Sequence, residues 1–98
     1  MTLLAHQDTF PCIADAIRTN TSNGEYIEHK LLVTALLQNA GVESLVSAAS
    51  IHSKLSKERL ASNMVAWFSK TVTTGANPYA ASLERCRMNK RWAYRWCN

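Results

Sequence analysis

The apolar residues of this chain recur mostly every three or four positions, which is the spacing that one face of an α-helix requires. The first such segment starts near Thr9 and Pro11, a combination typical of a helix start, and ends in the polar run of residues 19–24. Its apolar side consists of Ile13, Ala14, Ala16 and Ile17. We therefore expect a short N-terminal helix that covers part of the core.

Residues 25–39 form the most strongly predicted helix. They are mostly Leu, Ala, Glu, Lys and Gln, which are good helix formers, and Gly41 stands where a C-terminal cap is expected. The centre of this segment, residues 31–37, is apolar almost all round when it is wound as a helix. Because neighbours usually enclose such a helix on several sides, we expect it to form the centre of the core, with a dimer interface as the alternative.

Two helices joined by a short polar connection are expected next, which is the outline of a helix-turn-helix. The first covers residues 42–50, and its apolar face consists of Val42, Leu45, Val46 and Ala49. The second is strongly amphipathic and covers about residues 57–71. Ser56 is suited to cap it, because its hydroxyl can accept a hydrogen bond from a free amide of the first turn.

The amphipathic helix has two distinct sides when its residues are placed at about 100° intervals. The side expected to be buried consists of Leu60, Ala61, Met64, Val65, Trp67 and Phe68. The outward side consists of Arg59, Ser62, Asn63, Ala66 and Lys70. Arg and Asn can read guanine and adenine edges, and Ser and Ala allow a close approach in a major groove. An ordinary solvent-exposed helix face is the alternative interpretation.

The C-terminal segment predicts a β-hairpin. Gly75 and Pro78 end the amphipathic helix, and two runs rich in Arg, Trp and Tyr flank the turn residues Asn89 and Lys90. The expected cross-strand pairs are Met88 with Arg91, Cys86 with Ala93, and Glu84 with Arg95. One face of this hairpin would carry Leu83, Arg85, Arg87, Trp92, Tyr94 and Trp96. A helix over residues 80–96 is the alternative, because Leu, Glu, Arg, Met and Lys also form helices.

These elements predict a mainly α fold with a C-terminal β-hairpin, in the α+β class. Residues 1–98 are expected to form one domain, as the chain length indicates. Within it, residues 1–24 form the N-terminal helix and turn, residues 25–72 the helical core with the helix-turn-helix, and residues 79–98 the basic hairpin.

Basic residues are concentrated in the second half of the chain. Residues 1–49 contain two basic and five acidic residues, a net charge of −3, whereas residues 50–98 contain nine basic and two acidic residues, a net charge of +7. If the second half lies together in the fold, one side of the molecule is electropositive, as is typical of proteins that bind nucleic acid.

The sequence disfavours several other classes of protein. An odd number of cysteines without a C-x-x-C pair indicates free thiols in a reducing compartment; these are Cys12, Cys86 and Cys97. The histidines lack metal-ligand spacing, so no metal or cofactor is expected; they are His6, His29 and His52. With three glycines and no paired carboxylates in the basic half, the chain is not expected to be an enzyme. Without a long apolar run or a secretory signal, it is expected to be cytoplasmic and to contact no membrane.

The order of these elements resembles a winged helix-turn-helix DNA-binding domain. The likeness covers residues 25–98, with KERLASNMVAWFSK in the position of the recognition helix and ERCRMNKRWAYR in the position of the wing. It implies base-edge contacts from Arg59, Ser62 and Asn63, and contacts with the DNA backbone from Lys57, Lys70, Arg87, Lys90 and Arg91. Such domains often have a short strand between the first two helices, and none is expected near Gly41. The Trp-Ala-Tyr-Arg ending is also similar to DNA-binding modules of restriction-type nucleases.

The leading hypothesis is therefore a non-catalytic module that binds double-stranded DNA, for transcription regulation or restriction-modification. Its recognition helix would enter the major groove, and its hairpin, residues 83–96, would contact the backbone as a wing. It would act as a homodimer or with a fused or separate partner protein. The alternative is a small basic interaction domain, such as a phage- or plasmid-type inhibitor or adaptor, which docks a protein through Trp92, Trp96 and its arginines.

Overall fold

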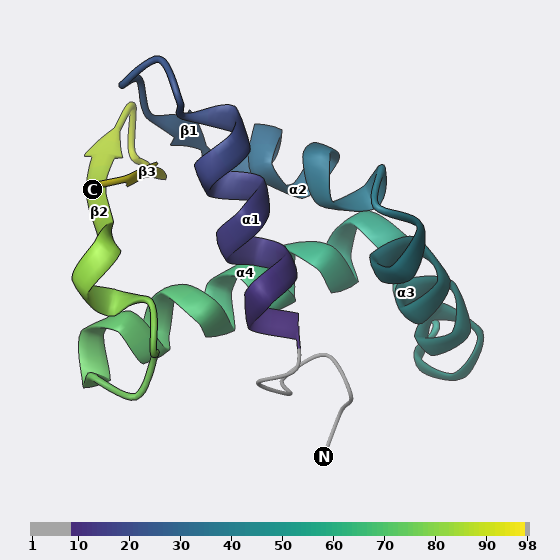
Figure 1. The fold of residues 1–98 in the computed structure, drawn as a ribbon. Coiled ribbons are helices and arrows are strands. Elements are labelled where there is room, and N and C mark those ends of the chain that lie inside the picture. Colours follow the sequence, from purple (N-terminus) through teal and green to yellow (C-terminus); the bar gives the residue numbers. More distant parts are fainter. Residues whose placement is uncertain (1–8, 98) are drawn as a thin grey trace.

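The computed structural model describes residues 9–97, which form four α-helices and a small antiparallel sheet (Figure 1). The elements in chain order are α1 (Phe10–Asn20), β1 (Ile27–Glu28), α2 (His29–Leu37), α3 (Ala40–Ser53), α4 (Lys57–Thr74), a 3-10 turn (Ala80–Ser82), β2 (Leu83–Met88) and β3 (Arg91–Trp96). The predicted α+β class is thereby confirmed. Residues 1–8, which include His6, lie outside the described residues. The expectation that the N-terminus is not a secretory signal falls on this segment.

The longest helix, α4, runs along the length of the molecule, with α3 near one of its ends and the sheet near the other (Figure 1). One continuous core joins all four helices to the central strand β3. Its largest fully buried side chains are Tyr94, Phe10, Phe68, Ile13, Ile17, Leu32, Leu36, Met64, Val46 and Val65. The core therefore holds the sheet against the helices through Tyr94 of β3 and Ile27 of β1.

The start and the end of α4 follow from its flanking residues. The Ser56 hydroxyl accepts a hydrogen bond from the Arg59 amide at 3.1 Å, as predicted for an N-cap. Gly75 ends the helix in the left-handed conformation, with φ of 80°. Trp67 differs from the prediction, because 38% of its surface is exposed. It lies at the edge of the apolar arc, next to the outward side, whereas the other residues of the arc are buried in the core.

The predicted helix of residues 25–39 is wrong at its N-terminal end. Residues Ile27–Glu28 form β1, and Ile27 pairs with Tyr94 and Glu28 with Ala93 across the antiparallel ladder. The side chain of Ile27 is buried in the core. Pairing with a strand that lies 65 residues later along the chain replaces the local helical hydrogen bonds. This strand lies before α2, and no strand occurs near Gly41 in the part of the chain that the structure describes, as expected.

The same predicted helix also ends early. Asn39 starts α3, because its side-chain oxygen accepts hydrogen bonds from the amides of Gly41 at 2.9 Å and Val42 at 3.1 Å. Gly41 is thus inside α3 and is not the C-terminal cap that we predicted. The enclosed environment predicted for residues 31–37 is also wrong in part, since Leu31 is 59% exposed and only one side of α2 faces the core.

Among the described residues, no single helix combines the length and the apolar character that a membrane crossing requires. The pair α2 and α3 would meet these criteria only if the two helices, which are bent by 95° relative to each other, were taken together.

The predicted hairpin is confirmed, including its register. Met88 pairs with Arg91, Cys86 with Ala93, and Glu84 with Arg95. The two turn residues are both left-handed, with φ of 53° at Asn89 and 67° at Lys90. The sheet order is β1-β3-β2, so the hairpin is joined to the rest of the sheet through β3. The helical alternative for residues 80–96 is therefore wrong.

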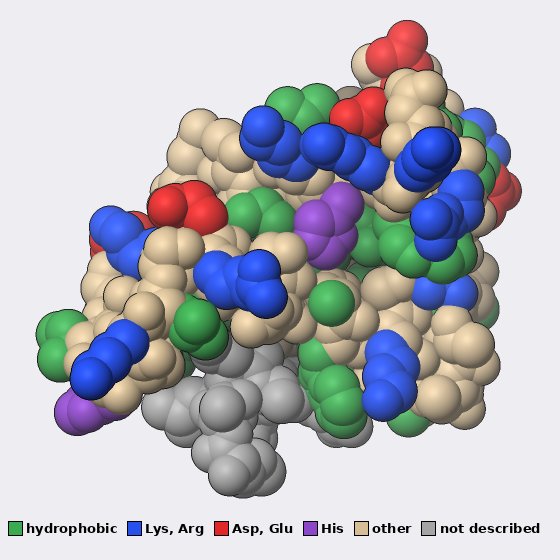
Figure 2. Space-filling view, turned by 180° about the vertical axis from the view of Figure 1, so that it is seen from behind, with side chains coloured by type: hydrophobic (Ala, Val, Ile, Leu, Met, Phe, Trp, Pro, Cys, Tyr) green, Lys and Arg blue, Asp and Glu red, His purple; other side chains and the backbone are tan. Residues whose placement is uncertain are grey.

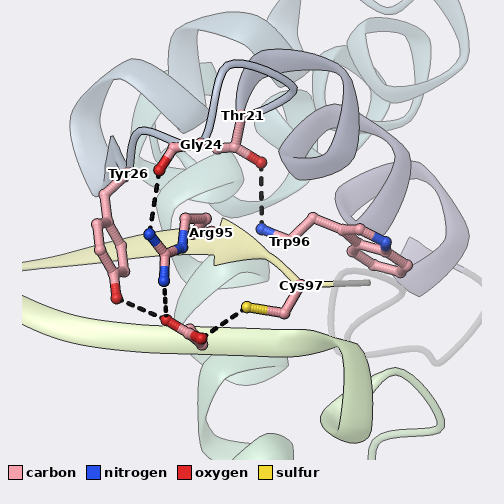
Figure 3. A network of polar contacts seen from close by, with 7 residues as sticks. Thr21, Gly24, Tyr26, Arg95, Trp96 and Cys97 are labelled. Carbon is pink, nitrogen blue, oxygen red and sulfur yellow. Dashed lines mark hydrogen bonds and ion pairs between the residues drawn. The ribbon is translucent and has the colours of Figure 1, made fainter.

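A polar network fixes the base of the hairpin to the segment that follows α1 (Figure 3). The Glu84 carboxylate accepts hydrogen bonds from the Tyr26 hydroxyl at 2.8 Å, from the Cys97 thiol at 2.7 Å and from the Arg95 guanidinium. Arg95 also donates to the Gly24 carbonyl at 3.1 Å. The donors from Cys97, Tyr26 and Arg95, in that order of effect, lower the pKa of Glu84 to about 2.

This network predicts an acid-dependent loss of stability. Because the pKa of Glu84 is lowered from 4.5 to about 2 in the folded protein, its ionised form stabilises the fold above about pH 4.5, and this contribution disappears as the pH falls toward 2. Urea unfolding of Glu84→Gln should therefore show a smaller loss of stability between about pH 6 and about pH 2.5 than the parent protein. The same substitution at the exposed Glu25 is the control. An unchanged pH dependence in Glu84→Gln would contradict the assignment.

Candidate nucleic-acid interface

The hairpin is held against α4 by one arginine. The Arg85 guanidinium donates to the Ser69 carbonyl at 3.0 Å, to the Ser69 hydroxyl, and to the Thr73 hydroxyl at 2.6 Å. It also lies 4.6 Å from the centre of the Trp92 ring, a cation–π distance. These contacts set the position of the hairpin relative to the helix.

Arg85→Met should therefore separate the hairpin from α4. The substitution keeps an apolar side chain of similar length but removes the hydrogen bonds to Ser69 and Thr73, so we expect the free energy of unfolding to fall by about 2 kcal/mol. Arg87→Met is the matched control, because Arg87 also lies against the Trp92 ring, at 5.4 Å, but is exposed and, among residues 9–97, donates a hydrogen bond only to the hairpin's own Lys90 carbonyl, at 3.2 Å. Chemical denaturation measures the free energy of unfolding of both variants. Equal losses in the two would argue against the role of Arg85 in holding the hairpin against α4.

A groove lies between the first turns of α2 and α4 and the tip of the hairpin. Its volume is about 630 Å³. Its lining residues are His29, Lys30, Val33, Ser56, Glu58, Arg59, Ser62, Lys90, Arg91 and Trp92. The structure thus brings together four of the predicted site residues, two from α4 and two from the tip of the hairpin; they are Arg59, Ser62, Lys90 and Arg91. We call this feature the helix–hairpin groove.

His29 lines the helix–hairpin groove and contacts both α4 and β3. Its Nε2 lies 2.8 Å from the Ser62 hydroxyl on α4, and its Nδ1 lies 3.3 Å from the Tyr94 hydroxyl on β3. Burial lowers the pKa of His29, which favours the neutral imidazole. Ser62 is therefore half-buried and bonded to a histidine, and it is not the freely outward-facing side chain that the helical wheel predicted.

The remaining outward residues of α4 form an exposed stripe along the helix. They are Arg59, Asn63, Ala66 and Lys70. From Arg59 to Lys70 the stripe is about 16 Å long at the rise of an α-helix. Lys70 lines a second, smaller hollow of about 220 Å³, which shares His29 and Trp92 with the helix–hairpin groove. The stripe and the groove are thus neighbouring parts of one surface.

Two predicted backbone-contacting residues lie elsewhere. Lys57 forms an ion pair with Glu43 on α3, with 3.0 Å between Nζ and Oε1, and does not line the groove. Arg87 is exposed on β2 beside Trp92, on the hairpin but outside the groove lining. The ion pair of Lys57 is half-exposed, so it contributes little to stability.

The sequence missed three residues of this surface. His29 and Lys30 reach the groove because α2 begins at residue 29, four residues later than predicted. No periodicity in the sequence indicates this start. Arg85, in contrast, was placed on the same hairpin face as Trp92 by the predicted register, which was a usable signal for its contact with that ring.

The predicted concentration of positive charge is visible on the side of the molecule from which α4 is seen. Lys and Arg side chains spread across this face, and fewer Asp and Glu side chains lie among them and along its upper edge (Figure 2). Of the two carboxylates in the second half of the chain, Glu84 forms an ion pair with Arg95, and Glu58 lines the groove. The groove itself therefore carries four cationic side chains, from Lys30, Arg59, Lys90 and Arg91, against one carboxylate.

No cluster of three or more His, Cys, Asp or Glu side chains suited to a metal ion occurs within residues 9–97, and Cys12, Cys86 and Cys97 are free thiols. Comparisons with protein-family models, with curated proteins and with solved structures found no match for this chain.

Proposed function

We propose that this protein is a non-catalytic, cytoplasmic module that binds double-stranded DNA. In this proposal α4 lies in the major groove and the β2–β3 hairpin contacts the neighbouring backbone as a wing. The observation that carries the proposal is the helix–hairpin groove, in which basic residues of α4 and of the hairpin turn face one cavity with a single carboxylate. A surface with this charge attracts phosphates and releases their counterions.

The order of the elements supports the likeness to a winged helix-turn-helix. Three helices, α2, α3 and α4, precede the hairpin, and the sheet places β3 between β1 and β2. The connection between α3 and α4 consists of residues 54–56, a length typical of a helix-turn-helix. Within the described residues no strand separates α2 from α3 near Gly41, which remains a difference from domains of this kind; β1 lies before α2 instead.

The exposed stripe of α4 is suited to reading base edges. Arg59 and Asn63 are one helical turn apart and both are exposed, and their side chains are those that pair with guanine and adenine. Ala66, the next residue of the stripe, leaves room for a close approach to the bases. Because Ser62 is bonded to His29, we propose base contacts for Arg59 and Asn63 and a positioning role for Ser62.

A titration of fluorescently labelled random duplex DNA tests the proposal at two salt concentrations. With four to six phosphate contacts, the logarithm of the binding constant should fall with the logarithm of the salt concentration with a slope of about −4 to −5. No binding at low salt would refute the DNA-binding proposal.

Arg59→Ala and Lys90→Asn should separate base reading from backbone contact. The comparison uses random duplex and a duplex selected from random sequences for tight binding to the parent protein. Arg59→Ala should reduce the preference for the selected duplex over random duplex by about 1–3 kcal/mol, because a base-edge contact is lost. Lys90→Asn should weaken binding to both duplexes alike, since asparagine also accepts the left-handed turn but lacks the charge. The binding constants of both variants for the two duplexes check this division, and the reverse pattern would contradict it.

A protein-docking role is the second candidate, and the exposure of Trp92 favours it. Trp92 is 36% exposed and flanked by Arg85 and Arg87, a combination common at interface hot spots. Trp96, the other predicted anchor, is partly buried and lies against Tyr79, with 6.1 Å between ring centres. If Trp92→Ala left the affinity for every acidic partner unchanged, this candidate would lose its main support.

A further inference from the structure

The helix–hairpin groove has the size of a small-molecule site. Its volume of about 630 Å³ lies within the range of pockets that enclose small organic ligands. It is formed by three elements that are fixed to one another: His29 ties α2 to α4 and to β3, and Arg85 ties the hairpin to α4. The cavity therefore exists before any ligand arrives.

The lining combines an aromatic wall with a cationic rim. Trp92 lines the groove and is 36% exposed even with Arg85 and Arg87 against its ring, and Val33 adds a small apolar contribution to the lining. The four cations of the groove outnumber its one carboxylate, Glu58. An aromatic wall favours a flat ring, and a cationic rim favours a phosphate. A ligand that satisfies both needs a planar aromatic body joined to an anionic group.

Ser62, which lines the groove, supplies a polar anchor. The Ser62 hydroxyl has one donor and two acceptor positions, and its contact with His29 uses one of them. The remaining capacity can serve a hydroxyl or a ring nitrogen of a ligand. Because His29 holds Ser62 in place, this anchor is pre-organised.

We infer that the helix–hairpin groove binds a free nucleoside monophosphate, with the base against Trp92 and the phosphate among the cations of Arg59, Lys90 and Arg91. Because these cations also carry the proposed contacts with DNA, an occupied groove should compete with duplex binding. Only this competition rests on the proposed function, whereas the binding of the nucleotide does not.

Titration of the 15N-labelled protein with AMP at low salt tests the inference without DNA. We expect a saturable shift of the Trp92 indole N–H signal, with a Kd below about 1 mM, and no such shift of Trp67, which lies outside the groove. Adenosine and inorganic phosphate should each bind at least about tenfold more weakly, because each meets only one of the two requirements. Binding of phosphate as tight as that of AMP, or no saturable shift up to about 10 mM AMP, would overturn the inference.

Two variants link the binding to the groove. Trp92→Leu should abolish the backbone amide shifts that AMP causes in the residues lining the groove, while Trp67→Leu, at a second exposed tryptophan, should leave these shifts unchanged. The amide spectrum of each variant shows whether it is folded, so that loss of binding is separated from loss of structure. Equal AMP binding in Trp92→Leu would refute the stacking assignment.

The competition is measured with labelled duplex at increasing AMP concentrations. At AMP concentrations about ten times its Kd, the apparent affinity for duplex should fall about tenfold. AMP binding in a protein that binds no duplex would support the nucleotide site and refute the proposed function. Duplex binding without any AMP binding would refute the nucleotide site and leave the proposed function in place.

Discussion

Removing the two cations at the hairpin tip should weaken binding to duplex DNA about 60-fold at about 0.1 M salt. The variant is Lys90→Asn combined with Arg91→Gln. Each residue is expected to neutralise one phosphate, and each such contact contributes about 0.9 to the salt slope. The slope should therefore fall by about 1.8, and the two binding curves should converge as the salt concentration approaches about 1 M. Asparagine accepts the positive φ of residue 90, so the turn is preserved.

Arg18→Gln combined with Lys54→Asn is the matched control. It changes the net charge by the same amount, and Lys54 is also left-handed, with φ of 62°. Neither residue lines the helix–hairpin groove. We expect less than a threefold change in duplex affinity, since remote charges act only through the screened overall field. Equal losses in the two variants would mean that net charge, and not the hairpin tip, drives the binding.

Phe68→Ala should have the largest effect on stability, a loss of about 3–5 kcal/mol. Phe68 lies on α4, is fully buried, and contacts Phe10 of α1 edge to face, with 5.2 Å between ring centres. Truncation leaves a cavity between these two helices, where the surrounding side chains close in only partly. For a domain of this size such a loss is a large share of the total stability, so much of the variant should be unfolded. Urea titration followed by circular dichroism measures the change.

Trp67→Ala is the control for this prediction. Trp67 is the neighbouring residue of α4 and is also a large aromatic residue, but it is 38% exposed, so its removal should cost only about 1 kcal/mol. If the two variants lost the same stability, the assignment of the α4 core face would be wrong. Duplex binding by Phe68→Ala should fall in proportion to its folded fraction.

Local chemistry accounts for the elements that were predicted correctly. The Ser56 cap and the left-handed Gly75 define the two ends of α4 through contacts within one turn of the chain. The turn at Asn89 and Lys90 sets the register of the hairpin, and with it the face that carries Arg85 and Trp92. The spacing of apolar residues in α4 identified its core side, except at Trp67 on the edge of the arc. Each of these features depends on residues that are close together in the sequence.

The tertiary structure decided the remaining features. Residues 27–28 have the composition of a helix start, but they form a strand because β3 offers backbone partners and the core buries Ile27. This strand moves the start of α2 to residue 29, and so brings His29 and Lys30 to the groove. Periodicity reports which residues face inward, but it carries no information on which distant segment they meet. The candidate site depends on contacts between distant segments, because α2, α4 and the hairpin each contribute only one wall of the groove.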